Sequence, residues 1–272
     1  LAHIIQKPYE KPGVAIVLRS DWQGVGKGVF AKYFGSLLGD HFTTVTEGRH
    51  LHGNFNAHQK KCLFLLGDEA VWGGDKRAEA KLKEMITEPT TICEFKGKDS
   101  FQIKSFIRLM LQTNSEWAAP VSLTDRRYFV LDVSEMRLND HVFFKEVENE
   151  KKNGGAEALL NVLQQFDLSD FEVREFPDTP ARQEQKLLSM QPLEEWWYSL
   201  LNNADTIIHD QVLKIDEINI VQKSHLLENF NQHAKEHIYK HRAWSAQRFG
   251  ATDKKTFTQI GNIKILRPAS CI

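Results

Sequence analysis

An apolar run followed by a glycine-rich loop constrains this chain more than any other stretch. Residues 14–18 are Val-Ala-Ile-Val-Leu, and a continuous apolar run of this kind predicts a buried strand. Glycines at 24, 26 and 28 surround Lys27, and residues 29–38 have helical spacing. In such a strand, loop and helix, backbone N–H groups and the helix N-terminus bind phosphate, while the lysine reaches the β- and γ-phosphates. The residues predicted to bind ATP are Gln23, Gly24, Val25, Gly26, Lys27, Gly28 and Val29.

The loop departs from the phosphate-binding pattern G-x-x-x-x-G-K-[ST] at two positions. Asp21 stands where the pattern has its first glycine, and Gly28 stands where it has Ser or Thr. The hydroxyl that helps to hold Mg²⁺ in such loops is therefore missing. Taken alone, the stretch fits an ordinary strand–turn–helix as well as it fits a nucleotide site, so the rest of the chain must decide.

Composition and charge exclude little. The chain has 272 residues, enough for one or two domains, and its net charge of −1 neither indicates nor excludes nucleic acid. Residues 223–272 carry nine lysines and arginines against three acidic residues, which fits either a polyanion partner or a solvated face. The three cysteines, at 62, 93 and 271, are scattered and favour a reducing compartment such as the cytoplasm. Because no apolar run approaches about 18 residues, no membrane span is expected.

Strand-like and helical stretches alternate through the first half of the chain. Four further strands are expected at 42–45, 62–70, 108–114 and 128–133, and a helix at 77–87. Residues 91–95 and 101–103 predict a β-hairpin with a charged tip. This alternation predicts an α/β fold with a mostly parallel sheet. We divide the chain into an α/β core at 1–150, a helical segment and linker at 151–190, and a helical or winged-helix-like region at 191–272.

Polar residues end two of the predicted strands. Asp68 and Glu69 follow one buried run, and Asn114 follows the next. ATP hydrolysis needs one acid that orients Mg²⁺ and a second that polarises the attacking water, roles that Asp68 and Glu69 could fill. Open α/β sheets bind ligands at the carboxyl ends of their strands, so these three residues and Lys27 are expected to converge. Asn114 would contact the γ-phosphate or the attacking water. The alternative is an ordinary polar strand end and a turn residue.

Two basic pairs complete the set of candidates. Arg126 and Arg127 precede a strand, where one of them could neutralise charge on a γ-phosphate or form a surface pair with Asp125. Lys96 and Lys98 flank a glycine at the hairpin tip. They could bind the sugar–phosphate backbone of DNA independently of its sequence, or serve solubility alone.

Several short motifs occur in a fixed order along the chain. They are Gln23-Gly24-Val25-Gly26-Lys27-Gly28, Gly53-Asn54-Phe55-Asn56, Leu66-Gly67-Asp68-Glu69-Ala70-x-Trp72, Leu82-Lys83-x-x-Ile86-Thr87-Glu88-Pro89, Lys96-Gly97-Lys98-Asp99, Thr113-Asn114-x-x-Trp117 and Asp125-Arg126-Arg127. Together they resemble the helicase part of phage and plasmid primase–helicase and primase–polymerase proteins, which belong to superfamily 3 in the AAA+ class. The resemblance covers roughly residues 10–190.

The resemblance implies a fold, a function and residue roles. It implies an AAA+ P-loop NTPase core in which the glycine loop and Lys27 form the Walker A element. Asp68 and Glu69 would form Walker B, Asn114 would be the sensor, and Arg126 or Arg127 would reach the site of a neighbouring subunit. Lys96 and Lys98 would grip DNA in the channel of a ring. Gly28 is usual in the phage-type branch of this family. Asp21 departs from the family's loop pattern, and such a departure is expected to weaken nucleotide binding.

The resemblance thus implies an ATP-driven replicative DNA helicase that needs ATP and Mg²⁺. It would act on single-stranded or forked DNA as a ring-shaped homo-oligomer, expected to be a hexamer. A primase or polymerase domain would precede the first residue, and a phage-encoded protein would act in the host cytoplasm. One alternative is a P-loop ATPase of DNA packaging or loading. The other is a nucleotide-dependent DNA-binding assembly module with little turnover.

Overall fold

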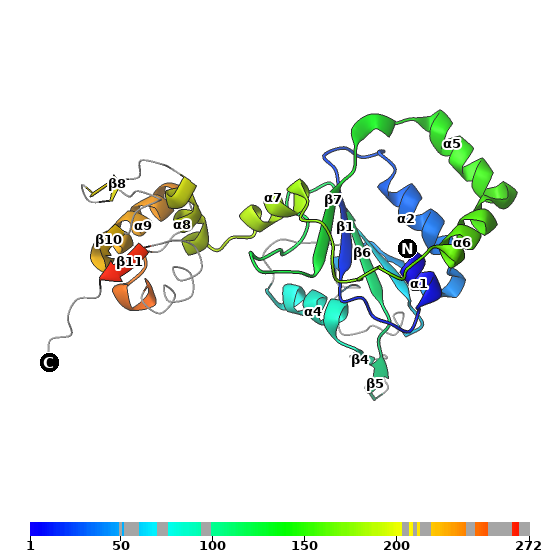
Figure 1. Ribbon diagram of the computed structural model, residues 1–272, viewed down its shortest axis with the longest axis horizontal. Coiled ribbons are helices and arrows are strands. Elements are labelled where there is room, and N and C mark those ends of the chain that lie inside the picture. The colour runs from blue at the N-terminus through cyan, green and yellow to red at the C-terminus, as the bar shows by residue number, and fades with distance from the viewer. Residues whose placement is uncertain are drawn as a thin grey trace. The chain divides into compact units, whose positions relative to one another are not determined.

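In the computed structural model, the chain divides into two compact units, Leu1–Ser189 and Met190–Ile272, and most contacts are made within each unit (Figure 1). Residues 151–189 thus belong to the first unit. No helix in the described part of the chain is both long and apolar enough to cross a membrane. The described residues are 1–48, 51, 60–69, 76–93, 99–202, 207–208, 211–212, 219–237, 243–249 and 263–266.

A five-stranded parallel sheet forms the centre of the first unit. The strand order is β2-β3-β6-β1-β7, and every neighbouring pair runs parallel. The predicted α/β fold with a mostly parallel sheet is therefore confirmed. The strands are β1 (Ala15–Arg19), β2 (Phe42–Val45), β3 (Phe64–Asp68), β6 (Arg108–Thr113) and β7 (Tyr128–Asp132).

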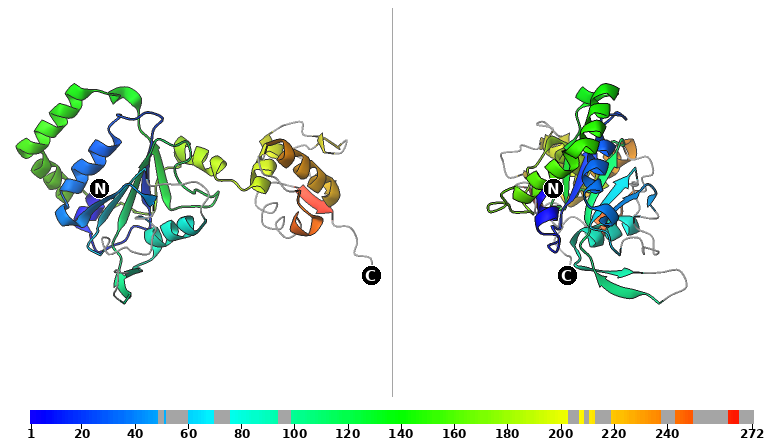
Figure 2. Two further views of the ribbon diagram at one scale, coloured as in Figure 1. Left: turned by 180° about the vertical axis from the view of Figure 1, so that it is seen from behind. Right: turned by 90° about the vertical axis from the view of Figure 1, so that its right-hand side faces the viewer.

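Helices cover both faces of the sheet, which explains why its central strands are buried along almost their whole length (Figure 2). Alternate residues of β3 and β6 enter two different cores: Leu65 and Leu109 lie in one, Leu66 and Met110 in the other. The helices of this unit are α1 (Ala2–Gln6), α2 (Lys27–Ser36), α4 (Lys76–Thr87), α5 (His141–Glu150), α6 (Ala156–Gln165) and α7 (Pro180–Leu188). Short helical turns are Gly39–His41, Glu135–Arg137 and Lys151–Gly155.

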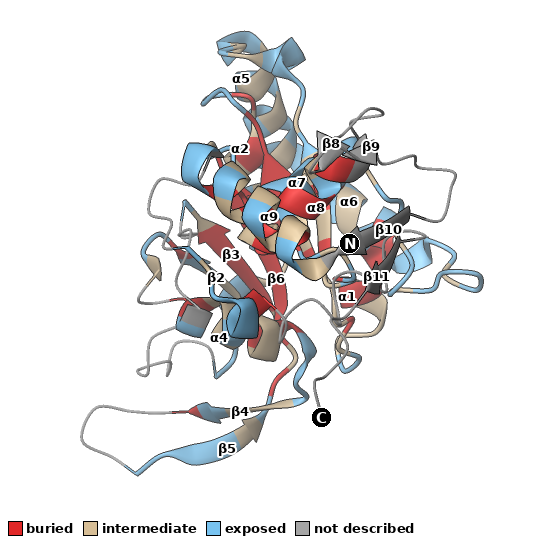
Figure 3. Cartoon of the chain, turned by 90° about the vertical axis from the view of Figure 1, so that its left-hand side faces the viewer, coloured by how far each residue is buried: buried red, intermediate tan, exposed pale blue. Residues whose placement is uncertain are grey.

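The predicted hairpin is confirmed in its two strands. β4 (Thr90–Cys93) pairs antiparallel with β5 (Phe101–Lys104), and the pair projects from the first unit beyond the sheet (Figure 3). Residues 94–98 lie outside the described residues, and with them Lys96 and Lys98.

The second unit has an aromatic core. α8 (Pro192–Asn202) and α9 (Lys223–His237) pack together, and Trp196, Trp197 and Phe230 are fully buried there. The Trp196 indole N–H donates to Asn229 Oδ1 over 2.8 Å, which satisfies its buried polar atom. The short strands are β8 (Ile207–Ile208), β9 (Gln211–Val212), β10 (Asn219–Gln222) and β11 (Ile263–Leu266). The winged-helix interpretation stays a prediction.

Candidate functional site

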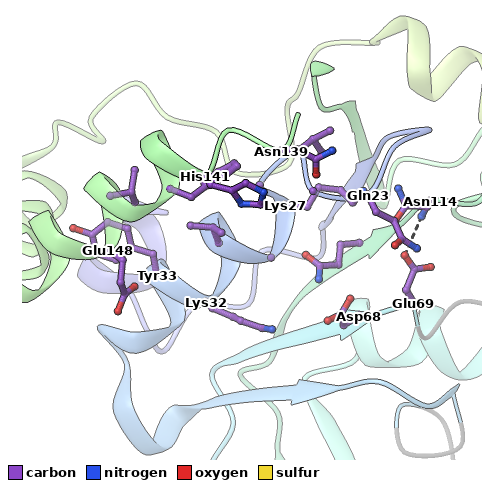
Figure 4. Close-up of a pocket in the computed structure, with 18 of the residues that line it drawn as sticks. Gln23, Lys27, Lys32, Tyr33, Asp68, Glu69, Asn114, Asn139, His141 and Glu148 are labelled. Atoms are coloured by element: carbon purple, nitrogen blue, oxygen red, sulfur yellow. Dashed lines mark hydrogen bonds between the residues drawn. The ribbon is translucent and has the colours of Figure 1, made fainter. Parts of the chain in front are cut away.

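A groove of about 640 Å³ lies at the carboxyl ends of the central strands. The structure brings together there all the residues predicted to bind ATP, together with Asp68, Glu69 and Asn114. In Figure 4 the two acids and Asn114 come from strand ends on one side of the groove, and Tyr33 and Glu148 come from α2 and α5 on the other. The convergence follows from the parallel sheet, whose carboxyl ends meet at one edge.

The backbone of the glycine loop requires glycine at two positions. Gly24 and Gly26 have φ of +81° and +103°, which side chains rarely adopt. A Cβ at Gly26 would lie 2.8 Å from the Phe144 ring, and one at Gly24 would lie 2.6 Å from Asn139 Oδ1. The loop therefore leads into α2 with its backbone closely covered by the start of α5.

Lys27 is buried at the first position of α2, and its ammonium points back into the loop. Nζ donates to Ser20 Oγ and lies 3.5 Å from the Trp22 carbonyl oxygen. Burial lowers the pKa of the Lys27 ammonium, and the charges of Glu69 and Asp68 oppose that shift. Asn114 Nδ2 donates to the Ser20 carbonyl over 2.8 Å and lies 3.3 Å from Ser20 Oγ. Ser20 thus links Lys27 of the loop to Asn114 at the end of β6.

Glu69 adopts a strained backbone conformation at the end of β3. Its φ of +53° is uncommon for a residue with a side chain and costs on the order of 1–3 kcal/mol. Its carboxylate accepts from Thr113 Oγ1 and from the Asn114 N–H, both over 3.2 Å. Its own N–H donates to the Gln112 carbonyl over 3.0 Å. Two groups at the end of β6 therefore fix where this carboxylate points, and the Gln112 carbonyl fixes the Glu69 backbone.

Gln112 supplies an unused oxygen beside Asp68. The two residues are paired across the β3–β6 ladder, and both line the groove. Gln112 is only 5% exposed, and its Oε1 is buried without a hydrogen-bond partner in the described structure. Buried polar oxygens are almost always hydrogen-bonded, so Gln112 Oε1 is available to accept a bond from a ligand or to coordinate a cation. Gln112 Nε2 and Oε1 lie 3.5 and 3.9 Å from where a Cβ of Gly28 would be, the atom that would carry the missing hydroxyl.

The far end of the groove is formed by α5, which our sequence reasoning did not assign to the site. Asn139, His141, Phe144, Val147 and Glu148 line it there. These residues lie in a charged stretch close to the expected end of the core at 150, and nothing in their order predicts that they face α2. Ser20 and Gln112 were missed as well. Ser20 follows a strand directly, as Asn114 does, and the same rule applied to β1 would have found it.

Arg126 and Arg127 lie elsewhere in the unit. They precede β7, so they stand at the amino edge of the sheet, and neither lines the groove. Arg127 Nη1 contacts Asp125 Oδ2 at 2.9 Å, and that carboxylate side chain is 1% exposed. Arg126 is exposed and forms no hydrogen bond or ion pair with the described residues. No group of three His, Cys, Asp or Glu residues in the described ranges could hold a metal ion.

Comparisons with known proteins agree with this fold. A family of unknown function, DUF5906, matches residues 18–127, a stretch that contains the glycine loop and all three strand ends of the groove. No curated protein matches the sequence.

Solved structures of the C-terminal region of NrS-1 resemble the chain. One apo structure has a TM-score of 0.64 and 17% identity over 94% of this chain and 56% of that one. Another, the A form, has a TM-score of 0.63 and 21% identity over 75% of this chain and 48% of that one. The chain thus spans about half the length of these structures. At such identities the likeness establishes the fold alone.

Proposed function

We propose that this chain is the ATP-hydrolysing domain of a DNA helicase of the superfamily 3, AAA+ type, acting as a ring. One observation carries the proposal: Lys27, Asp68, Glu69 and Asn114, which come from separate segments, line one groove. Lys27 and Glu69 are further joined through hydrogen bonds to Ser20 and Asn114. A loop cation, two carboxylates and an orienting amide are the parts that ATP hydrolysis needs.

The glycine loop is the proposed binding site of the triphosphate. Its backbone N–H groups and the N-terminus of α2 would face the phosphate oxygens, as glycine loops before helices do. Lys27 would exchange Ser20 and Trp22 for a phosphate oxygen when ATP binds. The burial that lowers the pKa of Lys27 also strengthens its attraction to a dianionic phosphate, since little water screens the pair.

The residues beside the loop fit Mg²⁺. Asp68 offers a carboxylate oxygen and Gln112 its unpartnered amide oxygen, and Mg²⁺ prefers oxygen ligands. A bound Mg²⁺ would neutralise the charge that develops on the transferred phosphoryl group. We propose that Gln112 replaces the hydroxyl that Gly28 lacks.

Glu69 is the proposed base for the attacking water. The water oxygen would form a bond to the γ-phosphorus, the bond to the β,γ-bridging oxygen would break, and Glu69 would accept the proton of the water. Thr113 and the Asn114 N–H hold this carboxylate in place. Asn114 would respond to the γ-phosphate, because its side chain is bonded to Ser20 beside Lys27.

The remaining parts concern a neighbouring subunit and DNA. Arg126 is exposed and without a partner in the described residues, so it is the arginine that we propose reaches a neighbour's groove. Arg127 is held by Asp125 instead. Lys96 and Lys98, which the sequence places between β4 and β5, would contact DNA phosphates. The second unit, helical and partly basic, is a further candidate for DNA contact.

Two substitutions test the proposal. Lys27→Ala is expected to abolish ATP binding, and Glu69→Gln to retain binding while lowering ATP turnover at least about a hundredfold. Turnover is measured with and without single-stranded DNA, alongside strand displacement on a forked substrate. Lys145→Ala, an exposed lysine of α5 outside the groove, is the matched control.

Three results would contradict the proposal. Full turnover in Lys27→Ala or Glu69→Gln would remove the assigned site. ATP binding and assembly with negligible turnover in the wild-type chain would indicate an assembly module instead. DNA-stimulated turnover without strand displacement would point to a packaging or loading ATPase.

A further inference from the structure

A second groove lies at the opposite edge of the same sheet. Its volume is about 370 Å³, and its lining includes His41, residues 60–63 and residues 103–107. These segments precede or enter β2, β3 and β6, whose carboxyl ends border the nucleotide groove or lie beside it. Because the strands are parallel, the two grooves are separated by the length of a strand, about 16 Å for five residues.

Three lysines give this second groove a positive charge. Lys60, Lys61 and Lys104 line it, all three are exposed, and none forms an ion pair within the described ranges. No aspartate or glutamate is among the described residues that line it. Lys60 Nζ lies 5.5 Å over the ring of Phe101, the first residue of β5. Three unpaired lysines around one hollow attract an anion with several charges.

An aromatic ring is displayed on the rim of this groove. Tyr9 is 66% exposed, although it belongs to a segment that is held firmly. The buried Arg108 guanidinium donates to the carbonyls of Lys7 and Pro8, each over 2.7 Å, and to that of Glu10. Lys11 Nζ ties the same segment to the hairpin base, through the Glu88 carbonyl at 2.5 Å and Ser105 Oγ at 3.1 Å.

Holding residues 7–10 in place requires burial of the charged Arg108 side chain. Burial lowers the pKa of the Arg108 guanidinium to about 10, yet no carboxylate contacts it in the described structure; its partners are backbone carbonyls. A charged group is therefore buried in order to hold the turn at Tyr9. Leu63, Ile103 and Ile107 give the groove apolar surface.

We infer that this groove binds a segment of single-stranded nucleic acid. Phosphates would lie on Lys60, Lys61 and Lys104, and an unstacked base would lie on Tyr9. Single-stranded binding sites combine a cationic track with an aromatic platform, and a duplex cannot offer a free base face. The inference deepens the proposed function and rests on it for DNA as the partner. It adds a contact that is independent of the hairpin tip and of ATP.

The test is binding of a fluorescent thymidine oligonucleotide of about twenty nucleotides by the full chain, without ATP, at several salt concentrations. Tyr9→Ala is expected to weaken binding about tenfold, whereas Tyr9→Phe keeps the ring and the affinity. Lys61→Gln and Lys104→Gln are each expected to lower the slope of log K against log salt by about 0.7. Lys145→Gln on α5 is the matched control, and melting temperatures verify folding.

Each possible outcome decides the inference. Unchanged affinity in Tyr9→Ala together with a loss in the lysine variants would indicate a polyanion site without base stacking, and would overturn it. An equal loss in Lys145→Gln would mean that overall charge is responsible, which also overturns it. Stronger binding of a matched duplex would exclude a single strand as the ligand.

The binding assay and ATP turnover, both measured for the wild type and for Lys27→Ala, separate this inference from the proposed function. If ATP turnover is absent in the wild type but binding still depends on Tyr9, the groove stands and the helicase proposal fails. If turnover depends on Lys27 but binding is indifferent to Tyr9 and the lysines, the helicase proposal stands and the groove fails.

Discussion

Gln112 shows at the scale of one residue how function and stability compete in this site. Its amide is 5% exposed within the central strand β6, where the five other residues are buried too. An unsatisfied oxygen in such a place destabilises a fold by about 1–3 kcal/mol. A side chain that costs stability at the edge of a functional groove is typical of a ligand-binding position.

The first prediction concerns this residue. Gln112→Leu is expected to raise the free energy of unfolding, in urea, by on the order of 1 kcal/mol, because an apolar side chain replaces a buried orphan oxygen. It is also expected to lower the affinity for Mg²⁺ about tenfold, measured by titrating metal into the complex with a fluorescent ATP analogue. Gln165→Leu, at an exposed position of α6, is the control. Unchanged metal affinity would remove Gln112 from the site.

The site residues differ in how far sequence could predict them. Lys27, Asp68, Glu69 and Asn114 follow from a rule that needs no coordinates, since strand ends of a parallel sheet meet at one edge. Gln112 does not, because its closeness to Asp68 depends on the register between β3 and β6, which no local pattern states. The left-handed backbone of Glu69 could not be predicted from the sequence either, since glutamate rarely adopts a positive φ.

At the scale of elements, α7 fastens the end of the first unit to its sheet. Thr179 caps the helix, its hydroxyl accepting from the Arg182 N–H over 3.2 Å. Gln185, fully buried, accepts from the Ala118 N–H over 2.6 Å and donates to the Glu116 carbonyl over 2.7 Å. One side chain thereby satisfies the turn that follows β6. α7 ends at Leu188, and the next helix, α8, begins at Pro192.

The second prediction follows from this anchoring. Gln185→Ala is expected to lower the stability of the first unit by about 3 kcal/mol, because buried backbone groups of residues 116–119 lose their partners. The measurement is urea unfolding followed by circular dichroism. Gln165→Ala, whose amide bonds only to Asn161 in the described structure and is exposed, should change stability by less than about 0.5 kcal/mol. Similar losses in both variants would mean that the buried hydrogen bonds contribute nothing special.

At the scale of the whole molecule, the proposed role of Arg126 requires a second chain. The groove holds the loop lysine, both acids and the asparagine, yet Arg126 stands at the amino edge of β7, on the other side of the sheet. A heterologous contact between identical chains places different surfaces of each subunit against one another, and repeats into a ring when the rotation closes. Such a contact would let Arg126 of one chain serve the groove of the next, which sequence order alone could suggest but not locate.

The third prediction tests this division of labour by mixing two inactive variants. Lys27→Ala subunits lack their own groove but keep Arg126, whereas Arg126→Ala subunits keep the groove. In an equal mixture about a quarter of the interfaces join an intact groove to an intact arginine, so about a quarter of wild-type turnover should return. Arg127→Ala provides the contrast: it leaves the buried Asp125 carboxylate unpaired and should lower the melting temperature instead. If the mixture stays as inactive as its parts, Arg126 does not act across an interface, and ATP hydrolysis gives no reason to propose a ring.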